Sequence, residues 1–243
     1  MLAESKRTHL NRALSKLGYC SRTVGDQWIA LGRVRVNGNK ATDPEQWVEL
    51  GTDNIEVTGI EAPRNHVYFL LHKPPGYVTT RSDELGRKTV YDLFPKETAW
   101  IFPVGRLDKE SEGLLFLTDD GEWANLLTDP AFHLEKEYRV KLDGNPLPHQ
   151  LESFRNGMPL EGRLTLPAKV MAENGGWHRV VITEGRNRQI RKMFHALGYK
   201  VKRLIRVRIG SFELGDLQLG KVRVLETDWV NRLRAEASAT LGG

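Results

Sequence analysis

The sequence predicts an α+β protein: a small helix, helix and hairpin domain, followed by a larger domain built on a mostly antiparallel sheet. In the larger part of the chain, short apolar runs typical of strands recur and few helical stretches separate them. The regular alternation of strand and helix that builds a parallel sheet is therefore not expected. Roughly the first quarter instead combines two amphipathic helical patterns with one strong hairpin turn.

The first helix is predicted over residues 10–17, where apolar residues recur at helical spacing and Gly18 follows as the residue that ends the helix. Ser21 is placed to cap a second helix. Gly25 lies inside that helix, where a glycine costs about 1 kcal/mol relative to alanine. The apolar stripe of the second helix is predicted to be Val24, Trp28 and Leu31.

A hairpin is predicted next, because residues 33–36 alternate arginine and valine and run into Asn37-Gly38, a strong signal for a two-residue turn. The valines are expected to point inward and the arginines outward. Residues 46–57 are expected to form a closing pair of strands around a turn at 51–53. The first domain is then predicted to span residues 5–59, and a linker rich in Gly, Pro and polar residues follows it.

The second domain is predicted to span residues 65–232, with a small, polar and disordered tail at 233–243. Its helices are expected at 123–127, 147–155 and 187–197, too few for repeated strand and helix units. Its strands are expected at 67–71, 100–104, 113–118, 137–142, 179–183, 201–209 and 221–225.

Positive charge is concentrated in two segments. Residues 5–40 hold eight Lys or Arg against Asp26, and residues 185–210 hold nine with no acid, which gives charges of +7 and +9. Subtracting both from the net charge of +5 leaves −11 on the rest of the chain. Such segregation attracts polyanions to particular faces of a protein, and nucleic acid is the polyanion expected here.

Several classes of protein are excluded by composition. Cys20 is the single cysteine, so a disulfide framework or a cysteine-clustered zinc site is not possible. The seven histidines include no close pair at the helical spacing of metal ligands, so a metal site is not expected. No apolar run reaches membrane-spanning length. We therefore expect a cytoplasmic protein without a membrane partner.

The strongest chemical candidate is Asp108, which lies in a short polar segment between two predicted strands, with Arg106 and Lys109 close by. A carboxylate on a tight loop near cations can stay ionised and act as a nucleophile or base. The alternative is a surface turn in which the aspartate only caps or pairs locally. Arg106 likewise has two interpretations, a contact with a substrate or a surface ion pair with Glu110 or Glu112.

A second cationic element is predicted at residues 184–209. In the helix, apolar residues form one stripe, and Arg188, Arg191, Lys192 and His195 project from the other side. In the strand that follows, isoleucine and valine alternate with Arg206 and Arg208, which predicts one apolar and one cationic face. Helix and strand together are expected to form a track for phosphates, and His195 is expected to be part of this surface rather than a catalytic base.

The first domain resembles the RNA-binding module of the ribosomal-protein S-four type. The similarity lies in Tyr19-Cys20-Ser21-Arg22 and in the run from Gly32 to Gly38. The resemblance implies a basic groove that holds structured RNA through its phosphates and positions the protein without doing chemistry. It assigns the RNA contacts to Arg22, Arg33 and Arg35.

The second domain resembles the pseudouridine synthases, and among them the RsuA branch, which modifies ribosomal RNA. Four motifs occur in the family's order, and they begin at Lys73, Gly105, Lys136 and Glu184. These enzymes detach uracil at nitrogen-1 and rejoin it to the ribose through carbon-5, without a cofactor. The resemblance implies that Asp108 is the catalytic carboxylate. It leaves open whether Asp108 adds to the base, attacks the sugar or removes a sugar proton.

The resemblance also implies roles for neighbouring residues. Asp108 needs a cation to stay charged in a closed pocket, and Arg186 is expected in this role with Arg191 as the substitute. Tyr138 is expected to lie against the target base, with Ile190 as an apolar floor, although both residue types are also common in protein cores. The remaining substrate-binding candidates are Arg106, expected to occupy the space left by a flipped-out nucleotide, and Lys73, expected to support the Asp108 loop.

The further RNA-binding residues are predicted to be Arg188, Lys192, Lys202, Arg203, Arg206 and Arg208. The expected partner is ribosomal RNA, with the large subunit favoured, and the expected state is a monomer.

Two other functions are compatible with parts of the pattern. A glycoside hydrolase also acts at an anomeric carbon, but its second carboxylate would have to come from the same short loop. A non-catalytic ribosome-assembly factor would use the basic surfaces only for binding.

Overall fold

The computed structural model describes residues 6–60, 66–95 and 100–239. By its contacts the chain divides into two compact units. The first consists of Met1–Tyr68, Glu97–Phe102 and Thr118–Ala124, and the second of Phe69–Lys96, Pro103–Leu117 and Asn125–Gly243. The predicted domains, 5–59 and 65–232, were each continuous in sequence, whereas two short later segments belong to the first unit.

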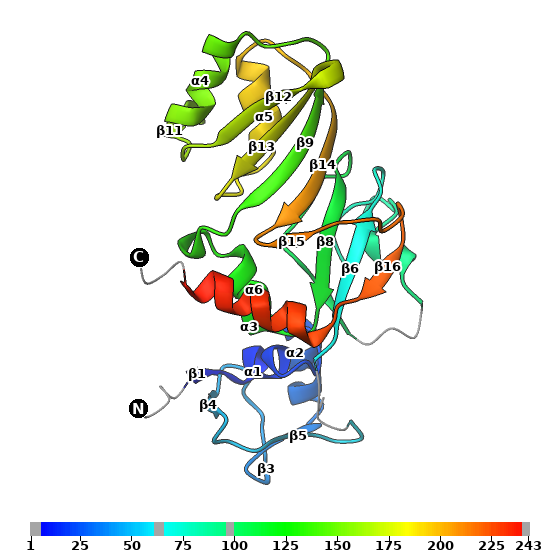
Figure 1. Ribbon diagram of the computed structural model, residues 1–243. Helices are drawn as coiled ribbons and strands as arrows, with labels where there is room; N and C mark the ends of the chain where they lie inside the picture. The colour runs from blue at the N-terminus through cyan, green and yellow to red at the C-terminus, as the bar shows by residue number, and fades with distance from the viewer. Residues whose placement is uncertain (1–5, 61–65, 96–99, 240–243) are drawn as a thin grey trace. The chain divides into compact units, whose positions relative to one another are not determined.

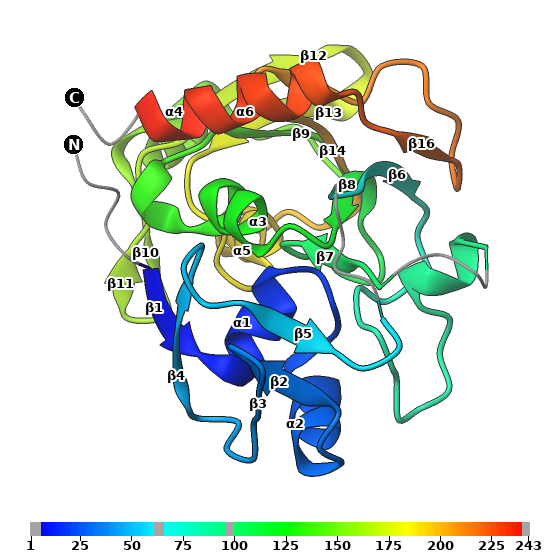
Figure 2. The same ribbon diagram turned by 90° about the horizontal axis from the view of Figure 1, so that it is seen from below.

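Two helices pack together in the first unit, α1 (Leu10–Lys16) and α2 (Arg22–Ala30) (Figure 2). The Ser21 side chain caps α2 by accepting a hydrogen bond from the Val24 backbone N–H at 3.3 Å, as predicted. Of the predicted apolar stripe, Val24 and Trp28 pack against the core of this unit, whereas Leu31 is 72% exposed, and the fully buried residues of α2 are Gly25 and Ile29. A Cβ atom at Gly25 would lie 3.3 Å from a methyl group of Leu14, so the glycine permits the close approach of the two helices.

The strands of the first unit form two small sheets. One has the order β3 (Asn39–Lys40), β2 (Val34–Val36) and β5 (Ile55–Val57), and the other pairs β1 (Lys6–His9) with β4 (Trp47–Leu50). The predicted Asn37-Gly38 turn is confirmed, with φ angles of 51° and 81°. The strands predicted at 46–57 do form, but they pair with β1 and β2 rather than with each other.

A nine-stranded sheet forms the centre of the second unit. It is mostly antiparallel, and its strands at 112–118 and 201–209 pair in parallel. All seven strands predicted for the second domain are present, but two strands of this sheet, at 169–173 and 212–213, were not predicted, nor was the small hairpin at 159–164. The main path runs in the order β12 (Lys169–Glu173), β13 (Trp177–Ile182), β9 (Lys136–Leu142), β14 (Val201–Ile209), β8 (Glu112–Thr118), β6 (Tyr68–Lys73) and β16 (Val222–Val224). Beside it, β7 (Phe102–Val104) pairs with β8 and β15 (Phe212–Glu213) with β14.

A bulge in β14 decides which of its side chains share a face. Arg206 lies opposite Tyr138 and Arg208 lies opposite Glu137, so the residue between the two arginines has no partner on β9. Because a bulge inserts one extra residue, it reverses the alternation of side chains beyond it. The prediction that Arg206 and Arg208 project from one cationic face is therefore wrong. Arg206 shares a face with Tyr138, and Arg208 shares the other face with Glu137.

The helices α4 (Pro148–Asn156) and α5 (Gln189–Ala196) pack on the β12, β13, β9 and β14 part of this sheet (Figure 1). Phe154 of α4 and Phe194 of α5 have ring centroids 4.7 Å apart, and Phe194 also packs on His178 of β13. Shorter elements complete the unit. They are a small hairpin of β10 (Pro159–Leu160) and β11 (Arg163–Leu164), and the 3₁₀ turns η1 (Val90–Leu93), η2 (Pro130–Phe132) and η3 (Asn174–Gly176).

Two further helices complete the chain, α3 (Gly121–Thr128) and α6 (Thr227–Ala239). A disordered tail was predicted from residue 233, and this is wrong up to Ala239, because Leu233 and Ala237 are fully buried. Trp229 of α6 packs on Phe212 with ring centroids 4.9 Å apart. The last four residues of the predicted tail, 240–243, lie outside the described residues. No helix of the described chain is long and apolar enough to cross a membrane.

Candidate active site

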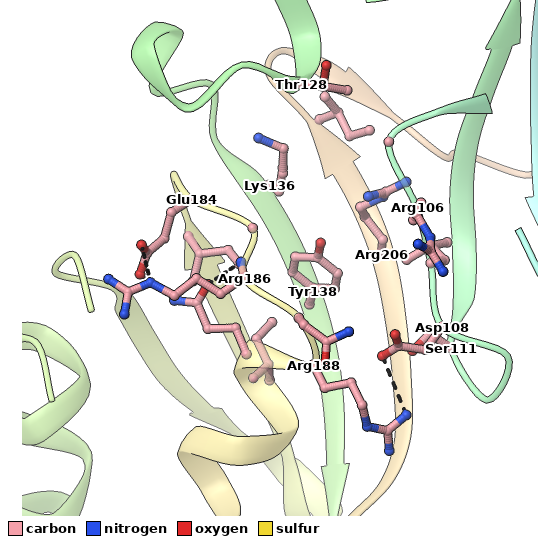
Figure 3. A pocket seen from close by; sticks show the side chains of 18 of the residues that line it. Arg106, Asp108, Ser111, Thr128, Lys136, Tyr138, Glu184, Arg186, Arg188 and Arg206 are labelled. Atoms are coloured by element: carbon pink, nitrogen blue, oxygen red, sulfur yellow. Dashed lines mark hydrogen bonds and ion pairs between the residues drawn. The ribbon is translucent and has the colours of Figure 1, made fainter. Parts of the chain in front are cut away.

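A cavity of about 430 Å³ opens on the sheet face that carries Tyr138 (Figure 3). Four parts of the second unit surround it. They are the loop that holds Asp108, residues 127–130 at the end of α3, the segment 182–190 that runs into α5, and the pocket-facing side chains of β9 and β14. The pocket therefore joins residues from three of the predicted motifs, which lie far apart in the sequence.

Asp108 lies on the loop between β7 and β8, and its side chain is 28% exposed. The loop is fixed mainly through its backbone. Thr79 donates its hydroxyl hydrogen to the carbonyl of Leu107 at 2.8 Å, and the Ser111 N–H bonds to the carbonyl of Asp108 at 3.0 Å. Because these bonds use backbone atoms, the Asp108 carboxylate remains available to the pocket.

Lys73 supports this loop from beneath. Its side chain is 0% exposed, and its ammonium donates to the carbonyls of Asp108 at 3.0 Å and Ser111 at 2.8 Å, and also to Pro74 and Lys109. Burial lowers the pKa of Lys73 to about 8. The supporting role expected for Lys73 fits these contacts. Its assignment as a substrate-binding residue is wrong, because the fully buried ammonium is occupied by backbone oxygens and does not line the pocket.

The cation nearest to the Asp108 carboxylate is Arg188. Its Nη1 lies 3.8 Å from Oδ2 of Asp108 and 3.0 Å from Oε2 of Glu110. Arg188 caps α5 in the left-handed conformation, with φ 52°, which is uncommon for a residue other than glycine. Such backbone strain is often found at functional sites.

The predicted partner of Asp108 is therefore wrong. Arg186 also lines the pocket, but it pairs with Glu184 at 2.9 Å and reaches the carbonyls of Arg163 and Leu164. The substitute named from sequence, Arg191, lies outside the pocket lining and donates to the carbonyl of Glu110 and the hydroxyl of Ser111. It holds the far end of the Asp108 loop, and the Asp108 carboxylate still acts on its charge, because burial lowers the pKa of Arg191 and Asp108 opposes that shift.

Tyr138 and Ile190 line the pocket as predicted, and they are 8% and 3% exposed. No residue of the described chain forms a hydrogen bond with the Tyr138 hydroxyl, and Figure 3 shows it pointing into the cavity. An aromatic ring with an open hydroxyl can stack on a nucleobase and also bond to it.

Arg106 lies on the Asp108 loop, is exposed, and lines the pocket. The surface ion pair considered from sequence is not formed. Glu110 pairs with Arg188, and Glu112 pairs with Arg203 at 2.8 Å. No carboxylate among the described residues binds the Arg106 guanidinium, which leaves it open to a substrate.

The predicted phosphate track is largely neutralised by acids from elsewhere in the chain. Lys192 pairs with Glu161 at 2.6 Å, and Arg208 pairs with Glu135 and Glu137. Arg206 is 3% exposed, so its assignment to an exposed RNA surface is wrong. Lys202 is exposed and has no acidic partner among the residues with described structure. The track is therefore interrupted rather than continuous.

The three arginines of the first domain that were assigned RNA contacts are all accessible to solvent or close to it. Arg22 is exposed at the start of α2. Arg33 donates to the carbonyl of Thr58 and its guanidinium lies over the Trp28 ring, and Arg35 donates to the carbonyl of Gly38. None of these contacts neutralises the charge, so all three keep a positive charge for binding an anion.

The sequence analysis did not assign two cations of the pocket to it: Lys136 was given no role, and Arg206 was placed on an exposed RNA-binding surface. Lys136 precedes Tyr138 by two residues on one strand, so the period of a strand alone places both on one face. That signal was available. No comparable signal predicts the position of Arg206, because that position depends on the bulge in β14.

A small basic module joined to a sheet domain with one open carboxylate in a cation-lined pocket defines a nucleic-acid-modifying enzyme. The family model of the S4 domain matches residues 10–54, and that of RNA pseudouridylate synthase matches residues 67–196. The chain belongs to the RNA pseudouridylate synthase family, and its activity is that of an RNA pseudouridine synthase.

Individual relatives agree with this assignment. Ribosomal large subunit pseudouridine synthase B of Bacillus subtilis (strain 168) is 39% identical over 235 residues, which cover 94% of this chain and 96% of that protein. The dual-specificity RNA pseudouridine synthase RluF of Escherichia coli (strain K12) is 38% identical over 232 residues, covering 94% and 78%. A crystal structure of a pseudouridylate synthase is 31% identical, with a TM-score of 0.70, and covers 93% of this chain and 99% of that one. The predicted resemblance to the RsuA branch is confirmed.

Proposed function

We propose that this enzyme converts a specific uridine of ribosomal RNA, in the large subunit, to pseudouridine, with Asp108 as the catalytic carboxylate. The names of the relatives support the choice of substrate, since one acts on the large ribosomal subunit. The S4 domain supports it independently, because such a module holds structured RNA. That the protein works in the cytoplasm as a monomer remains a prediction.

The observation that carries the role of Asp108 is its availability. Two carboxylates line the pocket, and Glu184 is already bound to Arg186, Gln189 and the Leu166 N–H. Asp108 has only the long contact with Arg188, while the backbone of its loop is fixed. A carboxylate held in place but not consumed by partners is suited to attack or to accept a proton.

The target nucleotide has to leave the stacked RNA to reach this pocket. A cavity of about 430 Å³ is of the size that holds a small ligand, so it admits a single nucleoside. Extrusion costs a few kcal/mol, and Arg106 at the rim is placed to fill the space the base leaves. Tyr138 and Ile190 then contact the base, and Arg188 keeps a positive charge beside Asp108.

An Asp108→Asn variant tests the proposal. With RNA that carries tritium on carbon-5 of uridine, the wild type should release label to water, and the variant should release none at a measurable rate. The control is Asp216→Asn, because the Asp216 side chain is 97% exposed. Unchanged release by Asp108→Asn would contradict the role of Asp108. Free uracil as the product would indicate a glycoside hydrolase, and RNA binding without either product a ribosome-assembly factor.

The ribosomal target is tested separately. Pseudouridines in ribosomal RNA are mapped in cells with and without the gene, and one large-subunit site should lose its modification. A complete large-subunit pattern, with a loss elsewhere, would contradict the substrate proposed here.

A further inference from the structure

Two cations face the pocket without an acidic partner, Arg206, which is buried, and Lys136, which is half-buried. Arg206 is 3% exposed, its Nε donates to the carbonyl of Leu114 at 2.8 Å, and its Nη2 is buried with no hydrogen-bond partner in the described part of the chain. The Lys136 ammonium donates to the carbonyl of Leu134 at 3.1 Å. No carboxylate of the described residues pairs with either cation.

Cations that are shielded from water and have no acidic partner lower the stability of the folded protein. Burial and the positive charge of Arg206 together lower the pKa of Lys136 to about 8. Glu135 and Glu137 are the sequence neighbours of Lys136, yet both pair with Arg208 on the opposite face of the sheet. Buried charges are normally paired, and perturbed ones gather at functional sites. The pair is therefore arranged for an anion that enters the pocket.

The position of the pair indicates which anion. Arg206 is the direct cross-strand neighbour of Tyr138, and Lys136 lies two residues from Tyr138 on the same strand. Directly opposed residues have Cβ atoms about 5 Å apart on one face of a sheet. The side chains of Lys136 and Arg206 thus flank the ring on which the proposed function places the uracil (Figure 3).

We propose that Lys136 and Arg206 bind the detached uracil and stabilise its negative charge. This inference rests on the proposed function. When the bond between nitrogen-1 and the ribose breaks, its electron pair moves to the base and spreads over nitrogen-1 and the two carbonyl oxygens. Carbon-5 then bonds to the ribose, its proton leaves to water, and nitrogen-1 takes up a proton. The bond electrons pass to the base whichever of the three roles Asp108 takes.

A phosphate of the RNA is the competing anion. It is less suited to this position, because Lys136 and Arg206 flank the residue expected to contact the base, whereas Arg106 on the exposed loop is open to the RNA backbone. The two cases differ in what they change. A contact with the departing base acts in the transition state and alters the rate, while a phosphate contact alters the affinity for RNA.

Single-turnover tritium release and RNA binding are measured for Lys136→Met and Arg206→Met, with Lys136→Arg and Arg206→Lys as charge-conserving variants. We expect the rate to fall about 10²- to 10³-fold in each methionine variant, as when one donor to a developing anion is removed. The charge-conserving variants should recover part of the rate, and RNA affinity should stay within about threefold. A large loss of affinity at an unchanged rate would assign the pair to a phosphate and overturn the inference. An unchanged rate and affinity would overturn it as well.

A second substrate probes the charge on the base. Fluorine at carbon-5 withdraws electrons and stabilises the leaving base by itself. The loss of rate in Lys136→Met should therefore be smaller when the target is 5-fluorouridine, measured as consumption of the fluorinated nucleoside. An equal loss on both substrates would show that the cation does not act on the charge of the base.

The control variant is Lys169→Met, which removes a lysine on β12 whose side chain is 74% exposed. Thermal unfolding separates folding from chemistry. Removing an unpaired buried charge should leave the melting temperature unchanged or raise it, whereas a merely structural residue would lower it. If the wild type releases no tritium, the proposed function fails. If the wild type is active and Lys136→Met matches it, only this inference fails.

Discussion

At the scale of single residues, the site depends on how cations are shared among carboxylates. Within the run from Arg186 to Arg191, three arginines take three different partners: Glu184, the Asp108 and Glu110 carboxylates, and the backbone of the Asp108 loop. The sequence shows that arginines are present but not their directions. The left-handed backbone at Arg188 turns its side chain toward Asp108.

The difference between Arg186 and Arg188 is testable. Arg188→Gln should lower the rate of tritium release about 10²-fold, because it removes the cation nearest to the Asp108 carboxylate. Arg186→Gln should lower the rate less and instead reduce the free energy of unfolding, because it leaves Glu184 partly unpaired. Rate and urea unfolding are compared for both variants. A larger loss of rate in Arg186→Gln would restore the assignment made from sequence.

Lys136 gives a prediction for pH. Its pKa is about 8 in the folded protein against 10.5 as the ordinary value. Between these values the unfolded chain holds more protons, so the wild type gains stability relative to Lys136→Met as pH rises. Urea unfolding should show the variant more stable at about pH 7, with an advantage that shrinks toward about pH 10. An advantage that grew with pH would contradict the half-buried, unpaired state of Lys136.

At the scale of elements, the bulge in β14 and the helix α6 are the two features that matter most. Without the bulge, Arg206 and Arg208 would share one face. With it, Arg206 enters the pocket and Arg208 joins Glu135 and Glu137 on the other side. The glycine at position 113 belongs to the same arrangement, since a Cβ atom there would lie 2.2 Å from the Arg206 carbonyl oxygen.

The ordered α6 leads to a stability prediction. Leu233 is 0% exposed, so Leu233→Ala should cost about 3 kcal/mol of the free energy of unfolding, as is usual when a buried leucine is truncated. The exposed neighbour serves as control, and Asn231→Ala should change stability by less than about 0.5 kcal/mol. Urea unfolding measures both. Equal stability of Leu233→Ala and the wild type would mean that this segment does not pack as described.

At the scale of the whole molecule, the charge pattern is more balanced than the two basic segments indicate. The acids that give the remainder of the chain its negative charge include Glu110, Glu112, Glu135, Glu137 and Glu161, and each of these forms an ion pair with a cation of the second basic segment. The RNA contacts are therefore expected from cations without acidic partners, such as Arg22 and Lys202 in the described chain.

RNA binding at several salt concentrations tests this expectation. Replacing Arg22 or Lys202 by alanine should weaken binding and reduce the salt dependence by about one phosphate contact each. Lys192→Ala is the matched comparison, because Lys192 already pairs with Glu161, and its effect should be smaller. A larger effect at Lys192 than at Lys202 would show that the ion pairs open when RNA binds.

The sequence by itself determined the fold class, the Asn37-Gly38 hairpin, seven of the nine strands of the large sheet, the family, and Asp108 as the candidate catalytic residue. These follow from local signals: apolar periodicity, turn residues and short motifs. The helix α6 was missed although Val230, Leu233 and Ala237 recur at helical spacing. The tertiary structure alone decided that Arg188 rather than Arg186 faces Asp108 and that Arg206 is buried. Those outcomes depend on a left-handed residue, an inserted residue in a strand and contacts with distant segments, which no local pattern encodes.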